Sequence, residues 1–218
     1  MPRVGAVWGR VACYNLRVSK DAPGVRYAEV YRETTETRVQ VVLDVDGGTR
    51  RDILTGINFF DHMINQLAFN AHIDLGLSAE GDLEIDDHHT VEDVGIVFGQ
   101  AISQAIDSDN HIARYASNHT VMDDALVLVA IDISGRGMLT YDVPFKREKI
   151  GDLSTECVRE FFRALSSHSG ITVHIHKVAG ENDHHVCEAM FKGFGRAFAD
   201  AVKKVERAFG ASTKGKRD

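Results

Sequence analysis

The sequence predicts a fold of mixed helices and strands in which one half-molecule occurs twice. Segments with the two-residue period of strands alternate with segments of helical period. The motif Asp-His-His-x-x-Glu begins at Asp87 and again at Asp183, and Leu67 has its match 98 positions later in Leu165. We therefore expect a first half-repeat at residues 26–110 and a second at residues 111–209, joined near Asp107–Thr120 and packed together as one unit.

The first half-repeat opens on a valine-rich alternating segment, Thr37–Val45, which predicts a strand. A turn at residues 46–48 follows, after which residues 49–56 can return as a partner strand. Residues 59–71 change to a helical period, residues 72–86 return to a period of two, and residues 90–106 form a second helix. The inward faces of the two helices are expected to carry Phe60, Met63, Ile64, Leu67 and Ala68, and Val94, Val97, Phe98, Ala101 and Ile102.

The second half-repeat follows the same order. An apolar strand is expected at Val121–Ser134, a turn at residues 135–137 and a strand that pairs back at residues 138–145. A helix at residues 153–170 ends at Gly170, because glycine suits the left-handed conformation of a helix C-terminus. A strand at residues 171–178 and a long amphipathic helix at His184–Ala208 complete it. Each half therefore reads strand–strand–helix–strand–helix.

Charge and cysteine content limit the classes of function. The 218 residues carry a formal net charge of -7 and a pI of about 5.9, so no basic surface for nucleic acid or an anionic membrane is expected. Three cysteines without a CxxC pair favour a reducing, cytoplasmic location, with Cys187 as a buried thiol. No run approaches the ~20 apolar residues of a membrane-spanning helix. Residues 1–25 are expected to be an N-terminal extension rather than a transit peptide, and the tail at residues 210–218, by composition alone, is typical of a frayed terminus.

The repeated motif predicts two metal sites. Residues four apart share one face of a helix, so His88 can reach the same ion as Glu92, and the same holds for the second motif. Adjacent residues diverge by about 100° around a helix, so His89 and His185 must find other partners. His62 and Glu160 are 98 positions apart and occupy matching places on the two earlier helices, so they complete the count. If each ion takes the spare histidine of the other motif, the two ligand sets are His88, Glu92, His185 and Glu160, and His89, His62, His184 and Glu188.

These ligand sets also indicate which metal is bound. Nitrogen and oxygen ligands without a thiolate favour Mn²⁺, with Fe²⁺ and Zn²⁺ as competitors. Polar neighbours are expected to hydrogen-bond to the ligands, namely Asp86, Asp87, Asp93, Asn182 and Asp183. The alternative interpretation is a set of surface or helix-capping histidines, which the duplication of the motif at two helix starts disfavours. The HExxH motif of zinc proteases is absent, which disfavours peptide hydrolysis.

Several segments around these motifs resemble a known family. They are FFDHM, GDLEIDDHHTVEDVGIVFGQA, DISGR, ITVHI and GENDHH, and over residues 32–214 the chain resembles imidazoleglycerol-phosphate dehydratase, the lyase of histidine biosynthesis. The resemblance implies an α+β fold of two duplicated halves, each a four-stranded sheet with helices on one face, similar to ribosomal protein S5 domain 2. It also implies a homo-oligomeric shell of twenty-four subunits, with active sites formed between subunits.

The resemblance implies a role for each site residue by position. Two manganese ions per subunit fall to His62, His88, His89, Glu92, Glu160, His184, His185 and Glu188, with Glu160 standing where many members have histidine. Contacts to the phosphorylated imidazole substrate fall to Glu36, His62, Asn70, His88, Glu92, Arg114, Arg136, His184, Lys192, Ser212, Thr213 and Lys214, of which the cations and the tail residues bind phosphate. Asn70 replaces a family histidine, and His72 stands two places on; asparagine still hydrogen-bonds but does not transfer protons.

The implied reaction removes water from D-erythro-imidazole-glycerol phosphate to give imidazole-acetol phosphate. The C–H proton that must leave is hard to remove, because no neighbouring carbonyl acidifies it. A dinuclear manganese site that stabilises the ring as an imidazolate would make this removal possible. Glu36 is the first candidate for the proton shuttle, with Glu92 and Glu188 in reserve. Two other classes fit the same ligands. A dinuclear metal-dependent phosphoester hydrolase would release inorganic phosphate, and a non-catalytic metal-storage shell would bind more than two ions per subunit.

Overall fold

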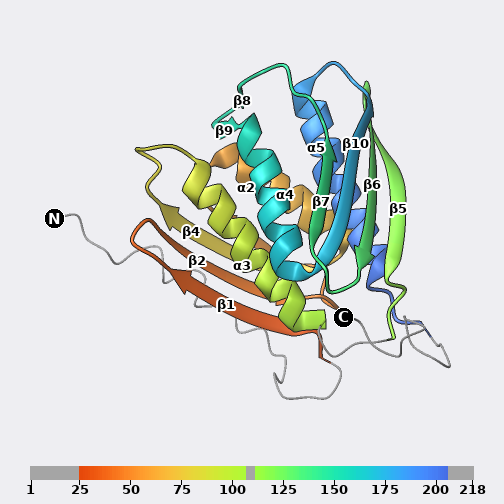
Figure 1. Cartoon of the computed structure of the whole chain (residues 1–218). Coiled ribbons are helices and arrows are strands. Elements are labelled where there is room, and N and C mark those ends of the chain that lie inside the picture. Colours follow the sequence, from red (N-terminus) through yellow and green to blue (C-terminus); the bar gives the residue numbers. More distant parts are fainter. Residues whose placement is uncertain (1–24, 107–110, 206–218) are drawn as a thin grey trace.

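Two four-stranded sheets and four helices form the computed structural model, which describes residues 25–106 and 111–205 (Figure 1). In spatial order the first sheet contains β1 (Tyr27–Glu33), β2 (Thr37–Asp44), β4 (Asp74–Gly81) and β3 (Arg51–Leu54). The second contains β5 (Tyr115–Met122), β6 (Ala125–Ile133), β10 (Ile171–Ala179) and β7 (Met138–Asp142). The helices are α2 (Asn58–Ala71), α3 (His88–Ile106), α4 (Thr155–Ser169) and α5 (Asp183–Ala201), and a short hairpin of β8 (Lys149–Ile150) and β9 (Leu153–Ser154) precedes α4. Within these ranges no helix combines the length and apolarity needed to span a membrane.

Both sheets have the same pairing pattern. In the first, β1 pairs with β2 and β2 with β4 in antiparallel fashion, while β3 is parallel to β4. In the second, β5, β6, β10 and β7 repeat this pattern strand for strand. A helix connects the two strands of each parallel pair, as parallel strands require. The α+β fold of two duplicated four-stranded halves is therefore confirmed.

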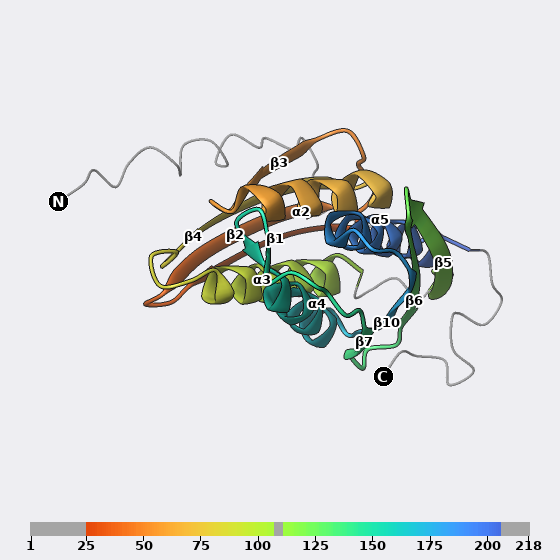
Figure 2. The same ribbon diagram turned by 90° about the horizontal axis from the view of Figure 1, so that it is seen from above.

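The four helices lie between the two sheets (Figure 2). Helix α2 packs against α5 and α3 against α4, so each pair combines one helix from each half. Aromatic rings meet in this layer: Phe161 stacks on Phe191 at a centroid distance of 5.5 Å and meets Phe60 edge-on at 5.3 Å. One continuous hydrophobic core therefore runs through both halves. The inward-facing residues predicted for the first two helices are all buried in it.

The duplication extends to the points where the helices cross. Gly99 on α3 and Gly195 on α5 are 96 positions apart, and each lies against the partner helix with no room for a side chain. A methyl group at Gly99 would stand 2.7 Å from the carbonyl oxygen of Leu165. One at Gly195 would overlap the carbonyl oxygen of Leu67. The two leucines matched by spacing in the sequence therefore occupy equivalent places in the structure.

We expect Gly195→Ala to lower the free energy of unfolding by about 1–3 kcal/mol, because the added methyl meets a backbone carbonyl that moves only if α2 shifts. Helix propensity alone would act in the opposite direction by up to about 1 kcal/mol. Gly193→Ala on the same helix is the comparison, since its methyl would meet a side-chain methyl of the buried Val129 at 2.8 Å instead of a backbone atom and should cost less. Urea denaturation followed by circular dichroism compares the two. Equal stability of both variants would contradict the close helix crossing.

Two strand pairings differ from the prediction. Residues 49–56 are predicted to return beside Thr37–Val45, but β3 pairs with β4, which lies between β3 and β2. Likewise, β7 pairs with β10 and not with β6. The cause is the helix that follows each third strand: the crossover through α2 or α4 delivers the next strand to the centre of the sheet. In the first sheet this central strand, β4, is buried along residues 74–79.

Further corrections concern element boundaries. The prediction omits β1 and most of β5, and it joins the last two residues of β5 to β6 although Asp123 and Asp124 form a turn between the two strands. The helix predicted to reach Ala208 ends at Ala201, and residues 206–208 lie outside the described ranges. Its last carbonyls accept hydrogen bonds from elsewhere: Arg114 N–H donates to Ala201 at 2.8 Å and the Arg26 guanidinium to Val202 at 2.5 Å. Gly170 has the predicted left-handed conformation, with φ 71°.

Candidate metal centre

Each histidine pair lies in the first turn of a helix that a polar side chain caps. The Asn182 amide oxygen accepts a hydrogen bond from the backbone N–H of His184 at 3.0 Å. The Asp86 carboxylate accepts one from the backbone N–H of His88 at 2.9 Å. The caps are 96 positions apart and therefore equivalent. Both cap the helix backbone, which corrects the prediction that they hydrogen-bond to imidazole rings.

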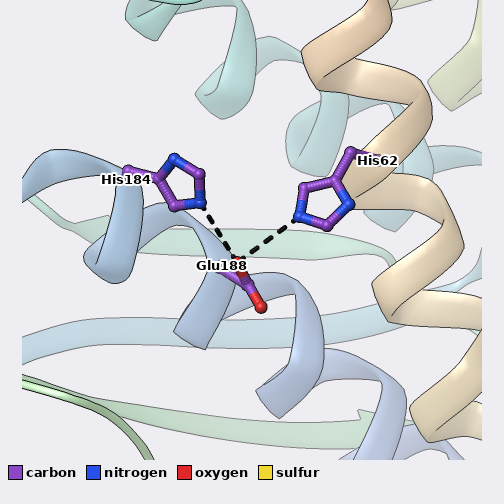
Figure 3. A group of neighbouring side chains, drawn as sticks. All are labelled: His62, His184 and Glu188. Carbon is purple, nitrogen blue, oxygen red and sulfur yellow. Dashed lines mark hydrogen bonds and ion pairs between the residues drawn. The ribbon is translucent and has the colours of Figure 1, made fainter.

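Three predicted ligands converge from two helices. His62 comes from α2, and His184 and Glu188 come from α5 (Figure 3). The Glu188 Oε2 atom lies 3.2 Å from His184 Nε2 and 3.5 Å from His62 Nε2. Among the His, Cys, Asp and Glu side chains of the described ranges, these three form the group whose ligand atoms all lie within 4.8 Å of one another. We call them the α2–α5 cluster.

The α2–α5 cluster has the composition and shape of an open metal site. The Glu188 side chain is only 8% exposed, whereas both imidazoles are 42% exposed, so the carboxylate forms a floor under two accessible rings. Burial acts to raise the pKa of Glu188, but the hydrogen bond and charge of Lys192, together with His184, outweigh it and hold that pKa below its usual value. The carboxylate is therefore ionised. Two imidazole nitrogens and a carboxylate oxygen suit Mn²⁺, Fe²⁺ or Zn²⁺.

The equivalent place in the other half holds His88 and Glu92 of α3 and Glu160 of α4. His88 Nε2 lies 3.9 Å from Glu92 Oε2. The Arg163 guanidinium joins the two carboxylates: it donates to Glu92 at 2.7 Å and also to Glu160. We call these residues the α3–α4 cluster. Its two carboxylates attract a positive charge, which Arg163 supplies in this structure. Because it contains one imidazole and two carboxylates, the α3–α4 cluster offers harder ligands than the α2–α5 cluster.

The second histidine of each motif points away from the cluster on its own helix. His185 Nδ1 donates to Asp124 Oδ1 at 2.6 Å. His89 Nδ1 lies 3.0 and 3.2 Å from the two carboxylate oxygens of Asp82, which raises the pKa of His89. Within one chain, therefore, the structure does not assemble either predicted four-residue set: His185 does not join the α3–α4 cluster and His89 does not join the α2–α5 cluster.

The hydrogen-bond partners of these imidazoles are not the ones that the sequence predicted. Beside the two caps already described, Asp87 accepts hydrogen bonds from Ser154, Asp93 from Arg32 and Thr37, and Asp183 from the backbone of residues 146 and 147. Sequence reasoning missed Asp82, Asp124 and Arg163. Asp82 and Asp124 lie near strand ends, and no local spacing relates them to a histidine 7 or 61 residues away.

The predicted phosphate-binding cations lie in different regions of the chain. Lys192 is beside the α2–α5 cluster, with its Nζ 2.6 Å from Glu188 Oε1. Arg114 is buried and forms a two-pronged ion pair with Asp132 at 2.7 and 3.2 Å. Arg136 is exposed in the turn after β6. Ser212, Thr213 and Lys214 fall outside the described ranges, as do the N-terminal extension to residue 24 and the tail at residues 210–218.

Arg114 and Arg136 are separated from the histidines by the length of the second half. The Arg114 backbone N–H bonds to Ala201 at the end of α5, whereas His184 is in the first turn of that helix. Seventeen residues at ~1.5 Å each place them about 26 Å apart along the axis. Strand β6 also separates the two ends. Its 9 residues at ~3.3 Å each span about 30 Å between the turn that holds Asp124 and the turn that holds Arg136.

The remaining predicted substrate residues are Glu36 and Asn70. Glu36 lies in the β1–β2 turn, with its side chain 53% exposed and Oε2 3.9 Å from His89 Nδ1. It lines an open cavity of about 280 Å³ together with Thr34, Arg38 and Asp82. Asn70 is two helical turns beyond His62, about 12 Å along α2, and donates to the Gln66 carbonyl at 2.8 Å. His72 follows as the left-handed C-cap of α2.

Comparison with known proteins places this chain in a family. The family model described as "Imidazoleglycerol-phosphate dehydratase" matches residues 55–198. Curated proteins of that name from Cereibacter sphaeroides (strain KD131) and Paracoccus denitrificans are each 52% identical over 193 residues, covering 88% of this chain and 99% of the relative. The protein of that name from Acetivibrio thermocellus is also 52% identical, over 191 residues, covering 87% and 98%.

Two crystal structures share the fold. The imidazoleglycerol-phosphate dehydratase of Staphylococcus aureus superposes with a TM-score of 0.74 at 34% identity, covering 82% of this chain and 99% of the other. The Pyrococcus furiosus enzyme in complex with (S)-C348 also has a TM-score of 0.74, at 36% identity, covering 85% and 99%. The matched share of this chain extends over both halves.

Proposed function

The chain belongs to the imidazoleglycerol-phosphate dehydratase family, hydro-lyases of histidine biosynthesis, and from this premise we propose that it dehydrates D-erythro-imidazole-glycerol phosphate with two manganese ions per subunit. The observation that carries the proposal is the convergence of His62, His184 and Glu188. These residues come from two halves of a duplicated molecule, and the equivalent positions of the α3–α4 cluster hold one histidine and two carboxylates, which Arg163 joins. Two equivalent ligand clusters match two metal ions.

The donor atoms fit manganese in both places. The α2–α5 cluster offers two imidazoles and an ionised carboxylate, and the α3–α4 cluster offers one imidazole and two carboxylates that already bind a cationic group, Arg163. When bound, two manganese ions would supply Lewis-acid stabilisation to the deprotonated imidazole of the substrate. Lys192 keeps Glu188 ionised and stands where it can neutralise part of the substrate's negative charge.

We further propose that a complete site takes residues from more than one subunit. Arg114 and Arg136 lie at the far end of the second half, about 26 Å from His184 of their own chain along α5, too far for a small phosphorylated substrate to touch both an arginine and that histidine. His89 and His185 also point away from the clusters of their own chain. A second copy that brings these groups to the clusters would complete the binding of phosphate and imidazole, and a closed shell of twenty-four subunits is the assembly that the resemblance implies.

Glu36 is our candidate for the group that moves the proton. Its carboxylate is more than half exposed and borders an open cavity next to His89, so a substrate side chain can approach it. Glu188 and Glu92 are each ion-paired within a cluster, which suits them to holding metal better than to transferring a proton. Asn70, bonded to the helix backbone two turns beyond His62, is left with a positioning role at most.

The proposed function is tested by removing and restoring the metal. Full-length protein stripped with a chelator is expected to lose dehydration of imidazole-glycerol phosphate, and Mn²⁺ at two ions per subunit is expected to restore it without release of inorganic phosphate. Metal analysis and a phosphate assay accompany the turnover measurement. Phosphate release in step with substrate loss would identify a phosphoester hydrolase, and uptake far beyond two ions without turnover would identify a storage shell. Either result contradicts the proposal.

A further inference from the structure

The duplicated halves each place a carboxylate at the start of their second strand. Glu36 directly precedes β2 and Asp124 directly precedes β6. The surroundings show that the two positions are equivalent. The residue after Glu36, Thr37, packs beside Gly81 at the end of β4, and the residue after Asp124, Ala125, packs beside Gly180 just after β10. Both carboxylates therefore face the second histidine of the motif in their own half.

In the second half this carboxylate binds the histidine directly. Asp124 Oδ1 accepts the hydrogen bond from His185 Nδ1 at 2.6 Å. Its other oxygen, Oδ2, accepts backbone hydrogen bonds from Glu181 at 2.6 Å and Asn182 at 3.1 Å, which holds the carboxylate in place. A neutral imidazole that donates from Nδ1 keeps its lone pair on Nε2. The Nε2 atom of His185 lies 3.4 Å from the exposed carboxylate of Asp123.

In the first half another carboxylate has taken this position. Asp82, at the end of β4, places both oxygens within 3.2 Å of His89 Nδ1. Glu36 stands 3.9 Å from the same nitrogen, beyond hydrogen-bond distance, and is directed to the open cavity. The equivalent carboxylates have therefore diverged: Asp124 holds a histidine, while in the first half Asp82 does so and Glu36 is available to a ligand.

We propose that Asp124 and Asp82 are positioning residues that hold His185 and His89 in the tautomer whose Nε2 binds metal. The proposal rests on the proposed metal function, because it concerns how the two spare histidines are prepared for an ion completed by another subunit. Carboxylates that orient metal-binding histidines in this way contribute about 10–100-fold in metal affinity. The contact of Asp124 also links the β5–β6 turn to the start of α5, so that the histidine is set by the rigid sheet.

Asp124→Asn distinguishes a positioning role from a merely structural one. Asparagine has the same shape as aspartate but only one oxygen atom. That oxygen is needed to accept the hydrogen bonds from the backbone N–H groups of Glu181 and Asn182. Its NH₂ group then faces His185 Nδ1 and moves the imidazole proton to Nε2, the nitrogen needed by the metal. We expect the loop and the assembly to be preserved while Mn²⁺ affinity at one of the two sites falls about 10–100-fold. Electron paramagnetic resonance of free Mn²⁺ in titrations of the full-length protein measures this.

The first half gives a contrasting pair of variants. Asp82 accepts from His89 alone among the side-chain contacts of the described ranges, so an amide at this place can turn its oxygen to Nδ1. Asp82→Asn is therefore expected to keep Mn²⁺ affinity near that of the wild type, whereas Asp82→Ala is expected to lose about 10–100-fold. Glu36→Gln should keep both ions but lose turnover. Asp142→Asn, beside His176 on the other face of the second sheet, is the matched control and should change neither property.

His185→Ala separates failure of this inference from failure of the proposed function. If His185→Ala loses one Mn²⁺ ion and Asp124→Asn binds both as tightly as the wild type, Asp124 has no positioning role. If His185→Ala itself keeps both ions, the shared metal site is wrong and the positioning role with it. If Asp124→Asn fails to assemble, the two Asp82 variants provide the test. An equal loss of Mn²⁺ affinity in Asp82→Asn and Asp82→Ala would show that the hydrogen bond to His89 does not control metal binding, and would overturn the proposal.

Discussion

Alanine at His184 is expected to abolish dehydration together with the binding of one manganese ion. His184 Nε2 lies 3.2 Å from Glu188 Oε2 and shares that carboxylate oxygen with His62, so its loss removes one of three converging donors. Residues that only orient metal ligands contribute about 10–100-fold, so removing a ligand should cost more than about 100-fold in kcat/KM. His88→Ala in the α3–α4 cluster is expected to remove the other ion with a similar loss. Turnover and bound manganese are measured on the same samples.

Two variants exclude loss of fold as the cause. The His184 ring also packs edge-on against the Phe59 ring, with the two ring centroids 5.1 Å apart. His184→Ala therefore removes this packing contact as well as the ligand. Glu188→Gln keeps the side-chain shape and should still lose the ion, because the neutral amide replaces the ionised donor. His176→Ala removes a partly exposed histidine outside both clusters and should retain full activity. Wild-type turnover and two bound ions in His184→Ala would end the proposed role of the α2–α5 cluster.

Two inactive variants are expected to restore activity when they assemble together. Arg136→Ala and His184→Ala alter residues that lie at opposite ends of the second half, about 26 Å apart along α5 and β6. If one active site combines the arginine of one subunit with the histidine of another, about a quarter of the sites in a random mixture carry both intact residues. Co-expression of differently tagged subunits, followed by isolation of mixed oligomers, should therefore give about a quarter of wild-type turnover.

The matched control combines two changes within one cluster. His184 and Glu188 lie one turn apart on the same face of α5 and contact each other, so every subunit in a mixture of His184→Ala and Glu188→Ala lacks part of the α2–α5 cluster. This mixture should stay inactive. Mixed oligomers of Arg136→Ala and His184→Ala that also stay inactive, while each variant assembles normally, would contradict a site shared between subunits.

The helices were the most predictable part of the fold. Their apolar residues recur with a period that sequence alone reveals, and α2 and α4 have the predicted extent to within a few residues. The strand pairings were less predictable, because the alternation in residues 49–56 is equally compatible with β2 or β4 as a neighbour. The edge strand β5 (YASNHTVM) carries a mostly polar face and gives little periodic signal.

The candidate site divides in the same way. The motif spacing was sufficient to place His184 with Glu188 and to single out His62 from the matching helix of the other half. It could not show that Arg163 bridges Glu92 and Glu160, because the helices that carry these residues, α3 and α4, must first be packed side by side. Nor could it identify Asp124 as the partner of His185, since an aspartate 61 positions away meets the histidine only through the sheet.

The sequence by itself determined the family, the duplication and the donor side chains that are available to a metal, because helical period, repeated motifs and donor chemistry are local properties of the chain. Only the tertiary structure decided the strand order, the acid that holds each spare histidine and the distance between the arginines and the ligand clusters. The physical reason is that these features depend on contacts between segments far apart in sequence. Their meeting is set by how two sheets pack around four helices.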